Sequence, residues 1–186
     1  MITNLENVNS WEVVFDILSK IKKFKNGKSV LQVGAKMKHG GIHEWQKMFE
    51  KFAKYGYVNF DVLEIWEHNL NGLKGKYLNK KILGDVRNIA KFVDNEYDII
   101  FWWHGPEHTT KEEFTILQDS FEKFKDIIIV IGCPWGKYLQ GEVGGNLYEK
   151  HLYHWQPKEL EELGYDIYTT NYKNRKDIVG IKYIGE

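Results

Sequence analysis

Short apolar runs alternate with segments of helical period along most of this 186-residue chain. The runs have the length and the β-branched or aromatic content of strands, and the segments between them carry apolar residues three and four positions apart. Strands that are apolar on both faces and alternate with helices are typical of a parallel sheet with a helical layer on each side. The expected strands are 29–34, 58–65, 81–85, 97–103 and 126–132, and the expected helices are 11–24, 42–55, 86–93, 109–124 and 157–163.

Two further expected strands, 165–171 and 177–184, are separated only by the short polar segment "YKNRKD". A connection of that length suits a hairpin of antiparallel strands. The sequence therefore predicts an α/β fold: a three-layer doubly wound sheet, mostly parallel, with an antiparallel strand at its edge. We expect one domain over 1–186, in which 1–27 is an N-terminal helical segment, and a loop at the glycine- and asparagine-bearing segment 69–75.

The charge balance argues against several classes of protein. Lys and Arg together number 26, as do Asp and Glu, so the formal net charge is zero and there is no strong signal for nucleic-acid binding. The longest apolar runs, "IIFWW" and "IIIVIG", are too short to span a bilayer, and the first residues lack the pattern of a signal peptide. Cys133 is the single cysteine, so no internal disulfide can form. These features favour a cytoplasmic protein without a membrane partner, and they leave its oligomeric state open.

Ligands of doubly wound sheets bind beside the carboxyl ends of the strands, so the residues directly after each strand matter most. The first strand leads at Gly34 into "GAKMKHGG", which is either a plain turn or a loop whose backbone approaches a ligand. The second strand ends near Glu64 and the third at Asp85, while 102–108 and 133–140 follow the fourth and fifth. The sequence thus places a glycine-bearing loop and two carboxylates at one edge of the sheet.

Together, the glycine-bearing loop, the two strand-terminal acids, "YDIIFWW" and "IIIVIGCPWG" resemble class I S-adenosylmethionine-dependent methyltransferases over residues 28–184. In that family the loop after the first strand packs against the methionine part of the cofactor. The acid after the second strand accepts hydrogen bonds from both ribose hydroxyls, and the acid after the third lies near the adenine amine. The resemblance implies S-adenosylmethionine as the cofactor, and it implies a cofactor site at Gly34, Ala35, Glu64, Asp85, Val86 and Trp102.

The residue types suit these roles. One carboxylate can accept from two adjacent hydroxyls, and the adenine amine is a donor that needs an acceptor. Glu67 is a rival of Glu64 for the ribose, and Asp85 is alternatively the N-cap of the following helix. The cofactor's sulfonium is a cation, which suits an aromatic face such as that of Trp102 or Trp103.

Two longer segments, "DIIFWWHGPEH" and "NLYEKHLYHWQPKELEELGYDI", resemble family members that act on small molecules or glycans. In those members "EH" follows the fourth strand and H-x-x-W-x-P-x-E-L precedes the last strand pair. The resemblance implies an acceptor pocket at Trp103, Trp135 and His154, and methyl transfer to an oxygen or nitrogen of an unidentified acceptor. His154 either closes over that pocket or bonds a backbone carbonyl.

The segment "HGPEH" also matches H-x-x-E-H, a zinc-peptidase pattern. That pattern requires both histidines on one face of a helix, and Pro106 disfavours a helical Gly105. We therefore reject the peptidase interpretation and expect no metal site. His104, Glu107 and His108 are instead candidates for a general base, with a polar loop and helix cap as the alternative.

One residue departs from the pattern of the resembled family. Gln32 stands where that family usually has an acid, which commonly anchors the loop or the cofactor amine. This departure favours an alternative function, a non-catalytic module that retains the methyltransferase fold. A nicotinamide-dependent oxidoreductase is a further alternative, although the motif G-x-G-x-x-G is missing from the loop after the first strand.

Overall fold

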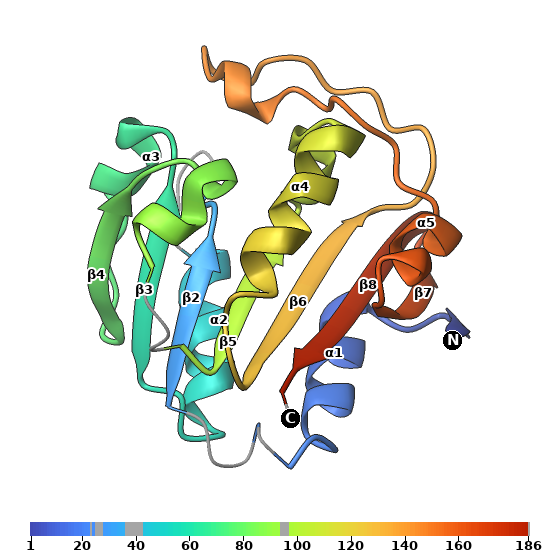
Figure 1. Cartoon of the computed structure of the whole chain (residues 1–186), viewed down its shortest axis with the longest axis horizontal. Coiled ribbons are helices and arrows are strands. Elements are labelled where there is room, and N and C mark those ends of the chain that lie inside the picture. Colours follow the sequence, from blue (N-terminus) through green and yellow to red (C-terminus); the bar gives the residue numbers. More distant parts are fainter. Residues whose placement is uncertain (23, 25–27, 36–42, 94–96, 186) are drawn as a thin grey trace.

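The computed structural model describes residues 1–22, 24, 28–35, 43–93 and 97–185, with 43–47 in backbone only. Its centre is an eight-stranded sheet with the order β1-β7-β8-β6-β5-β2-β3-β4 (Figure 1). Neighbouring strands are parallel, except that β8 is antiparallel to both β6 and β7. The strands are β1 (Ile2–Glu6), β2 (Ser29–Val33), β3 (Asn59–Glu64), β4 (Leu78–Leu83), β5 (Ile99–Trp103), β6 (Ile127–Pro134), β7 (Asp166–Tyr172) and β8 (Arg175–Ile184).

Helices lie on both faces of this sheet (Figure 1). One face is covered mainly by α1, α2 and α3, and the other by α4, α5 and the 3₁₀ helix η2. The helices are α1 (Ser10–Leu18), α2 (His43–Ala53), α3 (Glu67–Gly72), η2 (Val86–Lys91), α4 (Lys111–Phe121) and α5 (Pro157–Glu162), with short 3₁₀ helices η3 (Pro106–His108) and η4 (Leu147–Glu149). The predicted three-layer, mostly parallel α/β fold is therefore confirmed. The antiparallel strand of the predicted hairpin, β8, is third from the edge because β7 and β1 lie outside it.

The central strand β5 shows why the chain needs two helical layers. All five of its residues are buried, and they alternate between the two apolar clusters of the protein. Phe101 and Trp103 pack in the cluster beneath α1 and α2, whereas Ile100 and Trp102 pack in the cluster beneath α4. A strand with apolar side chains on both faces is stable only when both faces are covered.

Helix boundaries follow local capping signals in the well-defined cases. The side chain of Thr110 accepts from the backbone N–H of Glu113, and the Glu113 carboxylate accepts from the N–H of Thr110, so a capping box begins α4. Pro157 occupies the first turn of α5, where its missing N–H costs no hydrogen bond. Both starts agree with the sequence-based prediction.

Four segments differ from the prediction. The expected N-terminal helical segment begins with a strand, β1, which pairs with β7 at the other end of the chain. The expected helix 11–24 ends as α1 at Leu18, and the expected loop 69–75 contains most of α3. β4 ends at Leu83, so Asp85 lies beyond the strand rather than at its end. These elements depend on partners distant in the sequence, and a local pattern does not contain those partners.

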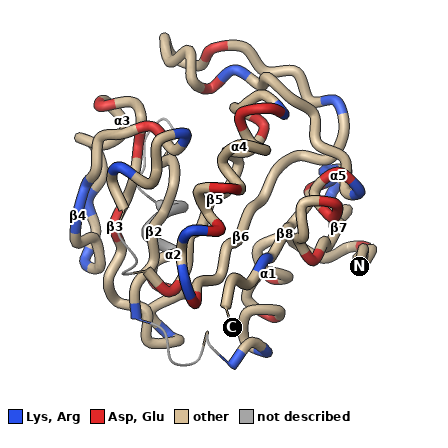
Figure 2. The backbone as a smooth tube through the Cα atoms, viewed as in Figure 1, with Lys and Arg blue, Asp and Glu red and all other residues tan. Residues whose placement is uncertain are grey.

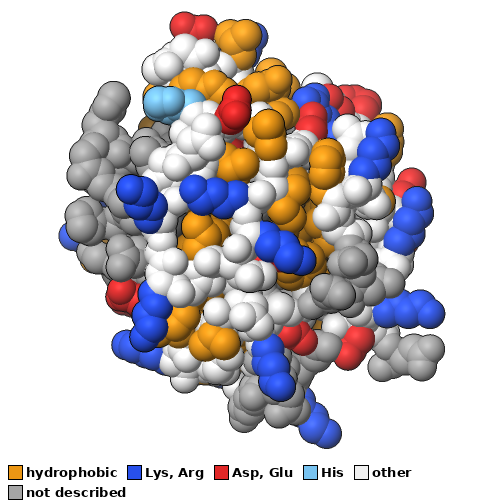
Figure 3. Space-filling model, turned by 90° about the vertical axis from the view of Figure 1, so that its left-hand side faces the viewer, with side chains coloured by type: hydrophobic (Ala, Val, Ile, Leu, Met, Phe, Trp, Pro, Cys, Tyr) orange, Lys and Arg blue, Asp and Glu red, His pale blue; other side chains and the backbone are white. Residues whose placement is uncertain are grey.

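Charged side chains are distributed over the described surface rather than gathered by sign. Basic and acidic residues both occur in most parts of the backbone (Figure 2). On the face drawn in Figure 3, the basic side chains of described residues are interspersed with acidic and apolar ones. Among the described residues, no helix combines the length and apolar character needed to cross a membrane.

Candidate active site

A cavity of about 1190 Å³ opens at the carboxyl ends of the central strands. The strand order reverses between β2 and β5, and ligands of doubly wound sheets bind at such a reversal. Residues 135–156, here called the flap, leave β6 and arch over this end of the sheet before α5 begins (Figure 1). The cavity wall combines residues from the ends of β2, β3 and β5 with residues of η2, η3, the flap and the β7–β8 hairpin.

Gly34, Ala35 and Glu64 meet on this wall, as the resemblance implies. Gly34 follows β2 with a φ of +75°, a conformation that favours glycine, and its N–H donates to the carbonyl of Leu63. The N–H of Ala35 donates to Oε2 of Glu64 (2.6 Å), while Oε1 accepts from the N–H of Trp66 (2.8 Å). The remainder of the loop, 36–42 with Gly40 and Gly41, lies outside the described residues.

Glu64 is a buried residue, only 5% exposed. Burial raises its pKa above the ordinary value, and the hydrogen bonds from Trp66, Ala35 and Asn69 oppose that rise. Glu67, the rival for the ribose role, lies at the start of α3 and is exposed, and it is not on the cavity wall. The geometry thus favours Glu64.

Gln32 organises the start of the loop in a way that an acid could not. Its side chain is fully buried, and Nε2 donates to the carbonyls of Val33 (2.9 Å) and Gly34 (3.0 Å). A carboxylate has no proton to donate to either carbonyl. Oε1 of Gln32 has no hydrogen-bond partner among the described residues. Gln32 therefore still anchors the start of the loop after β2, but it does so by donating hydrogen bonds, whereas an acid would accept them.

Asp85 has the capping role that was its alternative interpretation. Its Oδ1 accepts from the backbone N–H of Arg87 (2.9 Å) at the start of η2. The Arg87 guanidinium also bonds the Asp85 carboxylate, with Nη2 2.6 Å from Oδ2, and Nη1 lies 2.8 Å from Oε1 of Glu113. Asp85, Val86 and Arg87 all line the cavity. Asp85 therefore caps η2 and also lines the cavity, where the resemblance implies a position near the adenine.

Trp102 and Trp103 both line the cavity but belong to opposite faces of the sheet. Each is packed against a glycine. A Cβ added at Gly105 would lie 1.6 Å from Nε1 of Trp102, and one added at Gly132 would lie 2.4 Å from Cε3 of Trp103. Trp102 also stacks on Phe114 of α4. Both indoles are therefore held rigidly by the core, with an edge on the cavity.

The "HGPEH" segment does not form the peptidase helix, as predicted. His104 has a φ of +50° and lies outside η3, which begins only at Pro106. Nη2 of Arg175 donates to Nε2 of His104 (2.6 Å), so that ring carries its proton on Nδ1 and directs it to Oε1 of Glu107 (3.3 Å). The result is a chain of hydrogen bonds from Arg175 through His104 to a carboxylate that is 3% exposed.

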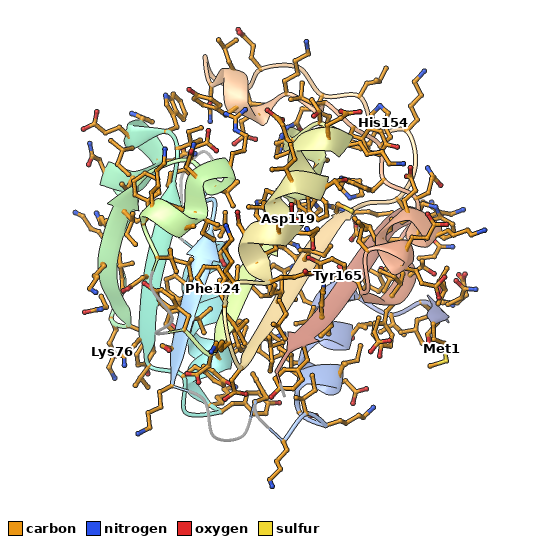
Figure 4. The ribbon with its side chains drawn as sticks, in the orientation of Figure 1. Met1, Lys76, Asp119, Phe124, His154 and Tyr165 are labelled. Carbon is orange, nitrogen blue, oxygen red and sulfur yellow. The ribbon has the colours of Figure 1, made fainter. Side chains whose placement is uncertain are left out.

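The flap contributes the outer wall of the cavity. Trp135, Tyr138 and Tyr148 line it, as does His151. His154, the predicted pocket residue, does not line the cavity; it lies near the end of the flap, shortly before α5 (Figure 4). The structure therefore brings Trp135 to the expected place and puts His151, rather than His154, beside the "HGPEH" segment.

Backbone hydrogen bonds determine that His151, rather than His154, lies beside Glu107. The N–H groups of Leu152 and Tyr153 donate to the carbonyl of Glu107 (2.8 and 3.3 Å). The indole N–H of Trp155, which is fully buried, donates to the carbonyl of Pro106 (3.1 Å). These bonds align the end of the flap with η3, so His151 reaches Glu107.

Arg175 and His151 are among the cavity residues that the sequence-based prediction missed. His151 stands in the same "HLYHW" segment as His154, and the sequence offered no means of ranking them. Arg175 begins β8 in the hairpin. Cys133, which follows the apolar part of β6, is buried, and burial raises the pKa of its thiol well above the ordinary value, so it is no nucleophile.

No family model matches the sequence, and no curated protein matches it. Solved structures do match. A SAM-dependent methyltransferase from Archaeoglobus fulgidus has a TM-score of 0.59 at 19% identity, and the match covers 94% of this chain and 95% of that one. Magnesium protoporphyrin IX methyltransferase from Synechocystis, solved with bound SAH, has a TM-score of 0.57 at 13% identity, covering 93% and 82%. A putative S-adenosylmethionine-dependent methyltransferase from Listeria monocytogenes has a TM-score of 0.57 at 11% identity, covering 92% and 98%. This chain has the fold of the class I S-adenosylmethionine-dependent methyltransferases.

Proposed function

We propose that this protein transfers a methyl group from S-adenosylmethionine to an oxygen or nitrogen of a small-molecule or glycan acceptor. The observation that carries the proposal is the buried carboxylate of Glu64, which ends β3, lines the cavity and orders the loop after β2. Its oxygens accept one backbone N–H each and a further hydrogen bond from the side chain of Asn69, and a carboxylate offers about four lone-pair sites in all. Acceptor capacity therefore remains for a ribose hydroxyl.

The rest of the cofactor would extend along the same wall. The positive φ of Gly34 leaves the backbone open, and a Cβ there would meet no described atom within 4 Å. Asp85 and Val86 lie further along the wall, where the adenine of the proposed cofactor would reach them. A fold shared with SAH-binding proteins supports this orientation, although fold alone does not determine function.

The flap side of the cavity is the proposed acceptor site. It carries aromatic side chains, Trp135, Tyr138 and Tyr148, together with the cations of Lys137 and Arg175. Aromatic faces with nearby polar groups suit a ring-bearing acceptor such as a sugar or a phenol. Trp103, the other predicted pocket residue, also lines the cavity.

In the proposed reaction, a lone pair of the acceptor attacks the methyl carbon as the carbon–sulfur bond breaks, and S-adenosylhomocysteine leaves. An attacking hydroxyl must also lose its proton. Of the predicted bases, His104 is engaged by Arg175 at Nε2. His108 directs Nδ1 to the carbonyl of Lys150 (3.1 Å), which leaves its Nε2 lone pair available beside Glu107. The pair Glu107 and His108 is therefore the better candidate for that proton.

Calorimetric titration tests the proposal. S-adenosylmethionine and S-adenosylhomocysteine should each bind once per chain, and NAD should not bind. Sugars and phenols should then be screened as acceptors with methyl-labelled cofactor, and the protein should transfer the labelled methyl group to one of these two classes of compound. Absence of binding by either cofactor form would refute the proposal.

The alternative function, a non-catalytic module, would appear in the same experiment as tight binding without transfer to any acceptor. The replacement of the usual acid by Gln32 motivates that alternative. An oxidoreductase is disfavoured because β8 is antiparallel inside the sheet, unlike the parallel sheet of dinucleotide-binding folds.

A further inference from the structure

Three side chains with metal-ligand chemistry converge on the cavity, although the sequence pattern pointed to no metal site. Glu107 and His108 come from η3 and His151 comes from the flap. One potential ligand atom from each lies within 4.8 Å of those of the other two. Nε2 of His151 is 3.9 Å from Oε1 of Glu107. All three residues line the cavity, so the space between them is open to it.

Both imidazoles are held in the tautomer that leaves the inner nitrogen free. Nδ1 of His108 lies 3.1 Å from the carbonyl of Lys150, and Nδ1 of His151 lies 2.7 Å from the carbonyl of Tyr138. A carbonyl oxygen only accepts, so each Nδ1 must carry the proton and each Nε2 must present a lone pair. A ring N–H donated to a backbone carbonyl is the usual support of a histidine that ligates a metal through its other nitrogen.

The carboxylate of Glu107 supplies a second, independent observation. Its side chain is 4% exposed, and its Oε2 has no hydrogen-bond partner among the described residues. A buried polar atom without a partner is costly, and a bound cation would remove that cost. Oε1 of the same carboxyl group lies 3.3 Å from Nδ1 of His104.

We propose that Glu107, His108 and His151 bind a divalent first-row transition-metal ion. Two imidazole nitrogens and one carboxylate oxygen suit Zn²⁺, Co²⁺, Fe²⁺ or Mn²⁺, whereas Mg²⁺ and Ca²⁺ prefer oxygen ligands alone. Three protein ligands leave coordination positions open, which is the arrangement of catalytic rather than structural sites.

The open positions of the ion would face the acceptor half of the cavity. There the ion would bind an acceptor oxygen and lower the pKa of its hydroxyl, in place of proton removal by His108. That role rests on the proposed methyl transfer. The metal site itself does not, because it is argued from side chains of η3 and the flap and not from Glu64.

Metal-stripped full chain should be titrated with CoCl₂ and followed by visible absorption, then with ZnCl₂ and MnCl₂ by calorimetry. We expect one Co²⁺ per chain, displaced by Zn²⁺, and at least about tenfold weaker binding of MgCl₂ and CaCl₂. Glu107→Gln and His151→Asn should each weaken Co²⁺ binding by at least about tenfold. His154→Asn is the matched control, because it removes a histidine three positions away that does not line the cavity, and it should bind Co²⁺ normally.

A second measurement keeps the proposal testable if Glu107→Gln does not fold. In ¹⁵N spectra of the metal-free protein, the rings of His108 and His151 should both show protonated Nδ1, and ZnCl₂ should shift their Nε2 signals. Equal Co²⁺ binding by the wild type and His151→Asn, or Zn²⁺ shifts at other histidines only, would overturn the proposal. Titration of S-adenosylhomocysteine into the wild type and each variant separates the metal site from the proposed function. A variant that loses Co²⁺ binding but still binds S-adenosylhomocysteine supports the metal site. A wild type that binds Co²⁺ but not S-adenosylhomocysteine refutes the proposed function and leaves the metal site standing.

Discussion

The backbone N–H of Ala35 donates to Oε2 of Glu64 across 2.6 Å, although Ala35 follows β2 and Glu64 ends β3. β2 and β3 are parallel neighbours, so their carboxyl ends meet at one edge of the sheet. The carboxylate that is proposed to bind a ribose therefore also determines the path of the loop proposed to hold the methionine part. Changes at Glu64 should affect both halves of cofactor binding.

Replacement of Glu64 should weaken binding of S-adenosylhomocysteine. In Glu64→Gln the side-chain NH2 must face the N–H of either Ala35 or Trp66, where it cannot accept a hydrogen bond because it is itself a donor, and the charge-assisted bonds to the ribose are lost. We expect binding weaker by about 10- to 100-fold, measured by calorimetry. Glu67→Gln is the matched control, since Glu67 is exposed and outside the cavity, and its affinity should be unchanged. Equal losses in the two variants would contradict the assignment.

The pH dependence of stability should carry the signature of the same carboxyl group. Burial raises the pKa of Glu64 in the folded protein above its ordinary value of 4.5, so the folded state holds that proton more tightly than the unfolded chain does. Its contribution to the free energy of unfolding is complete below pH 4.5 and is lost as the pH rises through the raised folded-state pKa. Urea unfolding of the wild type and Glu64→Gln across this window should show the variant gaining relative to the wild type as the pH increases. A difference that stays constant with pH would mean that Glu64 is not perturbed.

Restoring an acid at position 32 should destabilise the protein. In Gln32→Glu a buried carboxylate would face the carbonyls of Val33 and Gly34, which now accept from the amide. We expect a loss of about 3 kcal/mol or more in the free energy of unfolding at neutral pH, and a smaller loss at acid pH, where the carboxyl group can donate. Gln32→Met removes the hydrogen bonds without adding charge and should cost about 1–2 kcal/mol. Chemical denaturation of both variants measures the difference, and a stabilised Gln32→Glu would show that the loop is anchored in another way.

A methyl group at Gly105 should disturb Trp102. The added Cβ would lie 1.6 Å from the indole nitrogen, so the ring must move from its place against Phe114. Gly105→Ala should lower the free energy of unfolding by about 1–3 kcal/mol, as measured by thermal or chemical unfolding. Gly141→Ala, in the flap, serves as control because a Cβ there would meet no described atom within 4 Å, and its stability should match the wild type.

The sequence by itself determined the fold class, and it predicted the residues of the proposed cofactor half of the site. Apolar periodicity is local, so it predicted β2, β3, β5 and β6, and the residues that end or follow them, Gly34 and Glu64 among them, without knowledge of the rest of the chain. Those residues lie at one edge of the sheet because the carboxyl ends of neighbouring parallel strands lie side by side. Only the tertiary structure decided where β1 pairs, because its partner β7 lies at the other end of the sequence.

The acceptor half of the site was likewise decided by tertiary contacts. "HLYHW" offers two equivalent histidines, and the backbone bonds of Leu152 and Tyr153 to Glu107 determine that His151 faces the cavity. Arg175 reaches His104 only because β8 turns back beside β6. Such placements depend on hydrogen bonds between segments distant in sequence, whereas a residue pattern records only the preferences of each segment taken alone.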